Sequence, residues 1–126
     1  MLIEQIEHRW LNAFERTFAL CKIQPGDVVA LLTESQSRRV NVDLARITLQ
    51  RMGAKIFEVC LPTPALSAPA PVRSTGASDV IQNLAPVVAA LQRANVVIDC
   101  TVEGMLHAPE LPAILKGAEG VVPRLF

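Results

Sequence analysis

The chain has 126 residues, enough for one domain with a hydrophobic core, and 51% of them are hydrophobic. Its 12 basic and 12 acidic residues balance, which argues against nucleic acid or an anionic membrane surface as a partner, because both need a basic face. No apolar run approaches the roughly 20 residues of a membrane span, and residues 1–8 are amphipathic and acidic, unlike a signal peptide.

The cysteines Cys21, Cys60 and Cys100 are odd in number and widely spaced. This pattern favours reduced thiols in a cytoplasmic protein over a disulfide framework or a zinc site. The chain has one tryptophan, four phenylalanines and no tyrosine, too few aromatic residues for a stacking platform that binds single-stranded nucleic acid. The high apolar fraction predicts that part of the surface meets another domain or subunit, so we expect a homo-oligomer.

The first predicted element is an amphipathic helix over residues 2–21. Its apolar residues trace one helical face: Leu2, Ile3, Ile6, Trp10, Phe14, Phe18 and Cys21. The opposite face is polar and carries His8, one turn after Glu4. We interpret His8 as part of a solvated helix face, because no third metal ligand is near it in the sequence.

A continuous apolar run at 28–32 is typical of a parallel strand buried on both faces. The polar segment 33–39 follows, and Ser37 is placed to cap the next helix through its hydroxyl. This segment contains no glycine, so a dinucleotide pyrophosphate cannot approach its backbone as in a Rossmann protein. An anion at the helix N-terminus, helped by Arg38 or Arg39, stays open as an alternative to a solvated loop.

The helix after Ser37 is predicted to reach about Met52 and to end at Gly53. The residues stepping along one side of it are Val40, Leu44, Ile47 and Arg51. A second strand over 55–61 completes a βαβ unit. The proline-rich segment 62–77 is predicted to be a long loop at the carboxyl edge of the sheet.

Ser78 and Asp79 open the next helical pattern, which Pro86 interrupts. Either the helix bends at Pro86, or a short turn ends near Leu84 and the main helix begins with Pro86 in its first turn. A third strand is predicted at 96–100.

The loop 101–107 follows this strand, and a fourth helix begins at 109–110, reaches about Leu115 and is closed by Gly117. A fourth strand is predicted over 120–126.

This alternation predicts a single α/β domain over residues 1–126. Its expected architecture is a small parallel, Rossmann-like or flavodoxin-like sheet of about four strands with helices on both faces. Ligands bind such sheets beyond the carboxyl ends of the strands, at the switch point in strand order. The loops 33–39, 62–77 and 101–107 should meet there.

Four reactive-looking residues surround the third strand: Asp99, Cys100, Glu103 and His107. A nucleophilic Cys100–His107 pair needs the two side chains in contact, and cysteine is more commonly a small buried hydrophobe. A metal site of Asp99, Glu103 and His107 has plausible ligand types, but its spacing matches no known motif. We expect His107 to act as a single polar group in a shared pocket, with capping of the next helix as the structural alternative.

Several segments of the sequence resemble one enzyme family. They are Lys22 to Leu32, Arg39 to Asn41, Ala54 to Pro62, Val97 to Asp99, and Met105 to Glu110. They resemble the N-terminal region of the 2,5-dihydroxypyridine dioxygenases and the related M29 aminopeptidases of the aminopeptidase T type. The combination of Arg-x-Asn at the first helix of the βαβ unit, Leu-Pro after the second strand and Leu-His-x-Pro-Glu after the third favours the dioxygenase branch, with the leucyl aminopeptidase type as the alternative.

The resemblance implies that the chain is the N-terminal domain of a longer metalloenzyme. The catalytic domain, with Fe(II) or another divalent metal, would be C-terminal to it, so this chain would bind no metal and would be inactive alone. Leu106 and His107 would face the pocket of a small aromatic substrate, and His107 would orient a ring hydroxyl or stabilise its anion. Substrate-binding roles for Ser37 and Arg38 depend on a first loop that is shorter than in the dioxygenases. A stand-alone dimerisation or anion-binding module is the alternative from another class.

Overall fold

The computed structural model describes residues 6–64 and 78–122. The elements, in chain order, are α1 (His8–Leu20), β1 (Val28–Glu34), α2 (Arg39–Arg51), β2 (Lys55–Leu61), α3 (Ala85–Gln92), β3 (Val96–Asp99), α4 (Leu111–Leu115) and β4 (Gly120–Val122). The predicted α/β class is confirmed. Most of the proline-rich loop, the first residues of the predicted N-terminal helix and the end of the predicted fourth strand lie outside the described residues.

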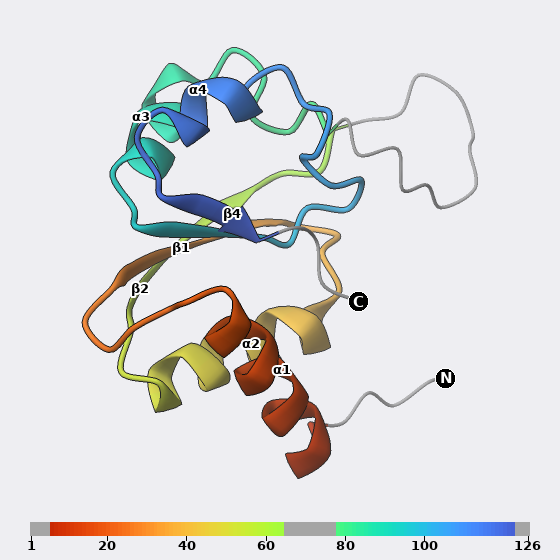
Figure 1. Ribbon diagram of the computed structural model, residues 1–126. Helices are drawn as coiled ribbons and strands as arrows, with labels where there is room; N and C mark the ends of the chain where they lie inside the picture. The colour runs from red at the N-terminus through yellow and green to blue at the C-terminus, as the bar shows by residue number, and fades with distance from the viewer. Residues whose placement is uncertain (1–5, 65–77, 123–126) are drawn as a thin grey trace, which may run out of the picture.

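The four strands form one parallel sheet in the order β2-β1-β3-β4 (Figure 1). The strand order therefore changes direction between β1 and β3, which are paired from Val29–Val96 to Leu32–Asp99. The crevice beyond the carboxyl ends of two such strands is where an open parallel sheet binds its ligands. Glu34 and Asp99 are the last residues of β1 and β3, so the fold places both at this point.

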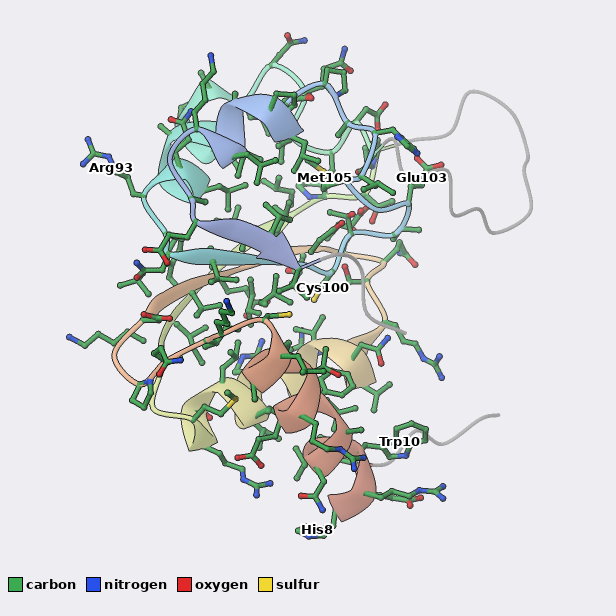
Figure 2. All side chains as sticks on the ribbon, in the orientation of Figure 1. His8, Trp10, Arg93, Cys100, Glu103 and Met105 are labelled. Atoms are coloured by element: carbon green, nitrogen blue, oxygen red, sulfur yellow. The ribbon has the colours of Figure 1, made fainter. Side chains whose placement is uncertain are left out.

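Helix α1 begins later and is less buried than its apolar pattern predicts. Phe18 is fully buried and Phe14 packs against the core, but Trp10 and Ile6 are 46% and 41% exposed. Figure 2 shows Trp10 and His8 at the outer end of α1, away from the sheet. Among the described residues of the predicted apolar face, Phe14 and Phe18 are therefore the ones that the core covers, while Cys21 is also exposed. His8 is exposed on the solvated face, as predicted.

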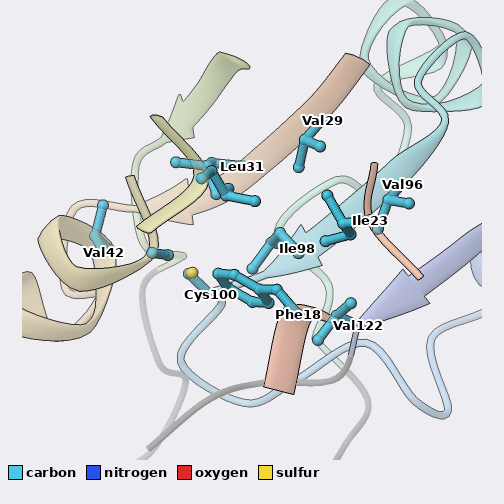
Figure 3. Close-up of a cluster of buried hydrophobic side chains, with 11 residues drawn as sticks. Phe18, Ile23, Val29, Leu31, Val42, Val96, Ile98, Cys100 and Val122 are labelled. Carbon is cyan, nitrogen blue, oxygen red and sulfur yellow. The ribbon is translucent and has the colours of Figure 1, made fainter. Parts of the chain in front are cut away.

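The helices cover both faces of the sheet, α1 and α2 on one and α3 and α4 on the other (Figure 1). The core on the α1 and α2 side contains Phe18, Ile23, Val29, Leu31, Val42, Ala45, Leu49, Val96, Ile98, Cys100 and Val122 (Figure 3). The opposite core contains Ala30, Leu32, Val80, Ile81, Leu91, Ala94, Val97, Met105, Ala108, Ile114 and Ala118. Alternate residues of β1 thus enter opposite cores, which explains why its sequence is a continuous apolar run.

Two predicted strand ends and the predicted apolar side of α2 need correction. β1 continues two residues past Leu32, and β3 ends at Asp99 instead of Cys100. Helix α3 begins at Ala85 with Pro86 in its first turn, so the second of the two alternatives for this helix is confirmed. The buried residues of α2 are Val42, Leu44, Ala45, Thr48 and Leu49, so Leu44 is the one member of the predicted row that is buried.

The predicted N-cap of α2 is wrong. The N-cap residue is Arg38, and it makes no side-chain capping bond. The hydroxyl of Ser37 is instead engaged with β1 and with the end of β3. At the other end of the helix, Gly53 has a φ of 81°, the left-handed conformation predicted for its stop. None of the described helices is long and apolar enough to cross a membrane.

Candidate functional site

The loops after β1 and β3 are joined at the switch point. The Ser37 hydroxyl accepts a hydrogen bond from the Glu34 amide at 2.8 Å and donates one to the Cys100 carbonyl oxygen at 2.5 Å. The Glu34 carboxylate accepts a hydrogen bond from the Val102 amide at 2.7 Å. These contacts confirm the prediction that the first and third loops meet at the carboxyl edge.

The described ends of the segment between β2 and α3 reach the same edge. The Thr63 amide donates to the Ser35 hydroxyl, and the Gln36 amide donates to the Thr63 hydroxyl, both at 2.9 Å. At the other end of the segment, the Ser78 amide donates to the Gly104 carbonyl oxygen at 2.8 Å. The middle of this loop lies outside the described residues.

Asp99 shapes the loop that follows β3. Its buried carboxylate accepts hydrogen bonds from the Thr101 amide at 2.9 Å, the Thr101 hydroxyl at 2.6 Å and the Met105 amide at 2.7 Å. The Thr101 hydroxyl also accepts a bond from the Gly104 amide at 3.0 Å. Hydrogen bonds to a charged acceptor are short and strong, so this carboxylate holds residues 101–105 in one conformation. Asp99 is thus a structural group at a strand end.

Leu106 and His107 occupy the corner of a β-turn. The Ala108 amide donates to the Met105 carbonyl oxygen at 3.0 Å, which places Leu106 and His107 at the two central positions. Met105 and Ala108 are buried, whereas Leu106 is 63% exposed and His107 is also exposed. The turn is thus anchored in the core and presents an apolar and an imidazole side chain outward. His107 does not cap α4, whose N-cap is Glu110.

Cys100 is a core residue. It is 7% exposed, and burial, reinforced by the negative charge of Asp99, raises the pKa of its thiol to about 12. A neutral thiol is a poor nucleophile. Figure 2 shows Cys100 at the sheet, with Glu103 and Met105 on the loop beyond it. The structure therefore does not support the nucleophilic Cys100–His107 pair.

The described residues do not fit a metal site. None of the described histidine, cysteine, aspartate and glutamate side chains form a group of three or more able to hold an ion. The alternative site of Asp99, Glu103 and His107 is therefore not formed, and the oxygens of Asp99 are used within its own loop. Arg38 is exposed at the start of α2, while the Ser37 hydroxyl is held by the two strands.

The sequence pattern gave no indication of Glu34. It is 5% exposed, although its polar neighbours indicated a solvated loop. The available signal was Thr33, a β-branched residue that prolongs the strand pattern by one position. Glu34 then ends the strand at the switch point, in contact with the loop after β3.

Comparisons with known proteins bear on this arrangement. The model of the NicX family, described as 2,5-dihydroxypyridine 5,6-dioxygenase, matches residues 9–122. The chain belongs to this family. The NicX resemblance seen in the sequence is therefore confirmed, while the link to the M29 aminopeptidases stays a prediction.

A solved structure agrees with the NicX assignment. The chain is similar to the 2,5-dihydroxypyridine dioxygenase from Pseudomonas putida KT2440, with a TM-score of 0.78 and 25% sequence identity. The similarity covers 93% of this chain and 34% of that one, so the chain spans about a third of the length of its relative. A search of curated proteins found no match.

Proposed function

We propose that this chain is the N-terminal α/β domain of a metal-dependent dioxygenase that opens the ring of 2,5-dihydroxypyridine or a close analogue. The observation that carries the proposal is the NicX family match over residues 9–122. The similarity to the Pseudomonas putida dioxygenase supports it. The domain would act together with further protein that holds the metal, and we expect the enzyme to be a homo-oligomer.

In this proposal, the Met105–Ala108 turn forms one wall of the substrate pocket. An exposed leucine beside an aromatic ring loses its contact with water, which favours ring binding. The neighbouring His107 imidazole accepts a proton from a ring hydroxyl or donates a hydrogen bond to its anion, since its ring nitrogens can act as acceptor or donor. Leu106 would therefore bind the ring and His107 would orient it.

Fe(II) or another divalent metal would be bound by residues outside the described part of the chain. The described residues offer no cluster of ligands, so we assign them no step that involves the metal. The Ser37 hydroxyl is already paired with the Glu34 amide and the Cys100 carbonyl, which suits a structural role better than substrate binding. A role for Arg38 in substrate binding stays a prediction.

Steady-state kinetics of the full-length protein, with its metal, test the proposal. His107→Asn should lower kcat/KM for 2,5-dihydroxypyridine by about 100-fold or more, the usual contribution of a positioned acid–base group. His8→Asn is the matched control, because His8 is exposed on α1, and it should leave kcat/KM within about twofold. Equal activities of the two variants would reject the role of His107. Turnover by the metal-free 126-residue chain would reject the proposal as a whole.

A further inference from the structure

We propose that Glu34 is a positioning residue for this site, and that its carboxylate fixes the location of the turn that carries His107. The inference rests on the proposed function, because the activity it affects is that of the dioxygenase. Glu34 is placed for this role by the fold: it ends β1 at the switch point and reaches the loop beyond β3.

The burial of Glu34 needs a reason. A carboxylate that is 5% exposed is costly to bury unless its charge accepts hydrogen bonds or meets a cation. Within residues 6–64 and 78–122, no cation forms an ion pair with Glu34. Its carboxylate accepts a hydrogen bond from the Val102 amide at 2.7 Å. A strand end that served only to pack would accept an apolar residue, as β1 does from Val28 to Leu32. The carboxylate is therefore explained by the amide that it binds.

The hydrogen bond from Val102 to Glu34 helps to fix where the loop of residues 101–105 lies relative to β1. The three hydrogen bonds of Asp99 lie within residues 99–105 and fix the internal shape of the loop. The pairing of Asp99 with Leu32 and the bond from the Cys100 amide to the Leu32 carbonyl oxygen tie the start of the loop to β1, but not the residues beyond Cys100. Glu34 supplies a connection to β1 through Val102, and Ser37 supplies another through the Cys100 carbonyl. Because residues 101–105 are held together, a shift at Val102 carries through to the turn. A displacement of about 1 Å at a catalytic group can cost about 100-fold in rate.

Substitutions of Glu34 that differ in hydrogen-bond acceptor and in side-chain length test this role in the full-length enzyme. Glu34→Gln retains a carbonyl oxygen for the Val102 amide and should keep kcat for 2,5-dihydroxypyridine within about threefold. Glu34→Met has similar length but no acceptor, and Glu34→Asp is one methylene too short. Both should lower kcat by about tenfold or more, with a smaller change in KM, because a misplaced group acts mainly in the transition state.

Glu58→Met is the matched control. Glu58 lies on the neighbouring strand β2, and its carboxylate binds Arg46 and the Thr33 hydroxyl, not the loop after β3. This variant should retain kcat within about twofold. If Glu34→Met fails to fold, Glu34→Asp and Glu34→Gln still give the comparison. Equal losses of kcat in Glu34→Asp, Glu34→Gln and Glu58→Met would overturn the proposal.

Hydrogen–deuterium exchange of the segment 100–108 separates this inference from the proposed function. Exchange should be about tenfold faster in Glu34→Asp than in Glu34→Gln, and unchanged in Glu58→Met. Unchanged exchange in Glu34→Asp would overturn the positioning role whatever the activity. Faster exchange in that variant, together with full activity of His107→Asn, would support Glu34 as the anchor of the loop and reject His107 as a substrate partner.

Discussion

The carboxylate of Glu34 and the backbone amide of Val102 are joined by a 2.7 Å hydrogen bond, although the residues are 68 positions apart. The bond crosses the gap between the carboxyl ends of β1 and β3, where strand order reverses. It links the centre of the sheet to the loop that ends in the exposed pair Leu106 and His107. The loop after β3 is therefore held firmly in place, with the side chains of Leu106 and His107 exposed at its end.

Removal of the Asp99 carboxylate should destabilise the domain strongly. Asp99→Ala leaves the Thr101 and Met105 amides buried without their acceptor, so the free energy of unfolding should fall by about 3–5 kcal/mol. Urea denaturation measures the change. Asp79→Ala, at an exposed position between the proline-rich loop and α3, should change it by less than about 0.5 kcal/mol. Similar losses in the two variants would show that the loop does not depend on this carboxylate.

Truncation of two aromatic residues on α1 should have unequal effects. Phe18→Ala should cost about 3–5 kcal/mol of unfolding free energy, because the ring is fully buried between α1 and the sheet. Trp10→Ala should cost less than about 1 kcal/mol, because the indole is 46% exposed. Thermal or urea unfolding distinguishes them. A larger cost for Trp10 would mean that the outer half of α1 is covered in solution.

The three cysteines should differ in reactivity towards a thiol reagent at pH 8. Cys21 and Cys60 are exposed and should react in the native protein, whereas Cys100 should react only after denaturation. Burial raises the pKa of the Cys100 thiol to about 12, so very little thiolate is present at this pH. Rapid modification of all three thiols without denaturant would contradict this assignment.

The same pKa shift predicts a loss of stability at alkaline pH. The folded state keeps the Cys100 proton above pH 9, where the unfolded chain begins to release it. Stability from this group is therefore complete below about pH 9 and is lost as pH rises towards 12, by up to about 1.4 kcal/mol per pH unit. Cys100→Ala should show a shallower decline in urea midpoint between pH 9 and 11. Cys60→Ala, at an exposed site, should keep the wild-type decline.

The ion pair between Arg46 of α2 and Glu58 of β2 should contribute modestly. The side chains are 30% and 27% exposed and lie 2.5 Å apart, and the hydrogen bond to Glu58 is the main cause that raises the Arg46 pKa. A double-mutant cycle with Arg46→Met and Glu58→Gln should give a coupling of about 1 kcal/mol at low salt. The coupling should shrink in 1 M NaCl. A coupling of zero at low salt would show that this ion pair does not help to hold α2 on the sheet.

Local sequence patterns were sufficient to predict the α/β architecture with its parallel sheet. The second strand has the predicted bounds Lys55–Leu61, and Gly53 stops α2 in the expected conformation. The apolar run that begins at Val28 identified the central strand, because a short run of this kind is typical of a parallel strand covered on both faces. The switch-point edge followed from this topology, and with it the meeting of the first and third loops.

The details that the sequence did not reveal depend on distant contacts. Ser37 looked like a helix cap because the pattern shows only its neighbours, whereas its hydroxyl binds the Cys100 carbonyl oxygen 63 positions away. Glu34 is followed by polar residues in the sequence, and these neighbours do not show that its carboxylate reaches Val102. Trp10 lies on the correct helical face, but periodicity does not say how far the neighbouring layer extends. Propensity and spacing describe only neighbouring residues. The contacts of Ser37 and Glu34 and the exposure of Trp10 depend instead on tertiary packing.

We expect His107, at the corner of its turn, to contact the substrate of the full-length dioxygenase. The most direct measurement is an experimental structure of the full-length protein with 2,5-dihydroxypyridine bound. We predict that an imidazole nitrogen of His107 lies within about 2.6–3.2 Å of a ring hydroxyl or its bridging water, with Leu106 against the ring. A ring bound in the active site with both residues more than about 8 Å away, beyond direct or single-water contact, would contradict it.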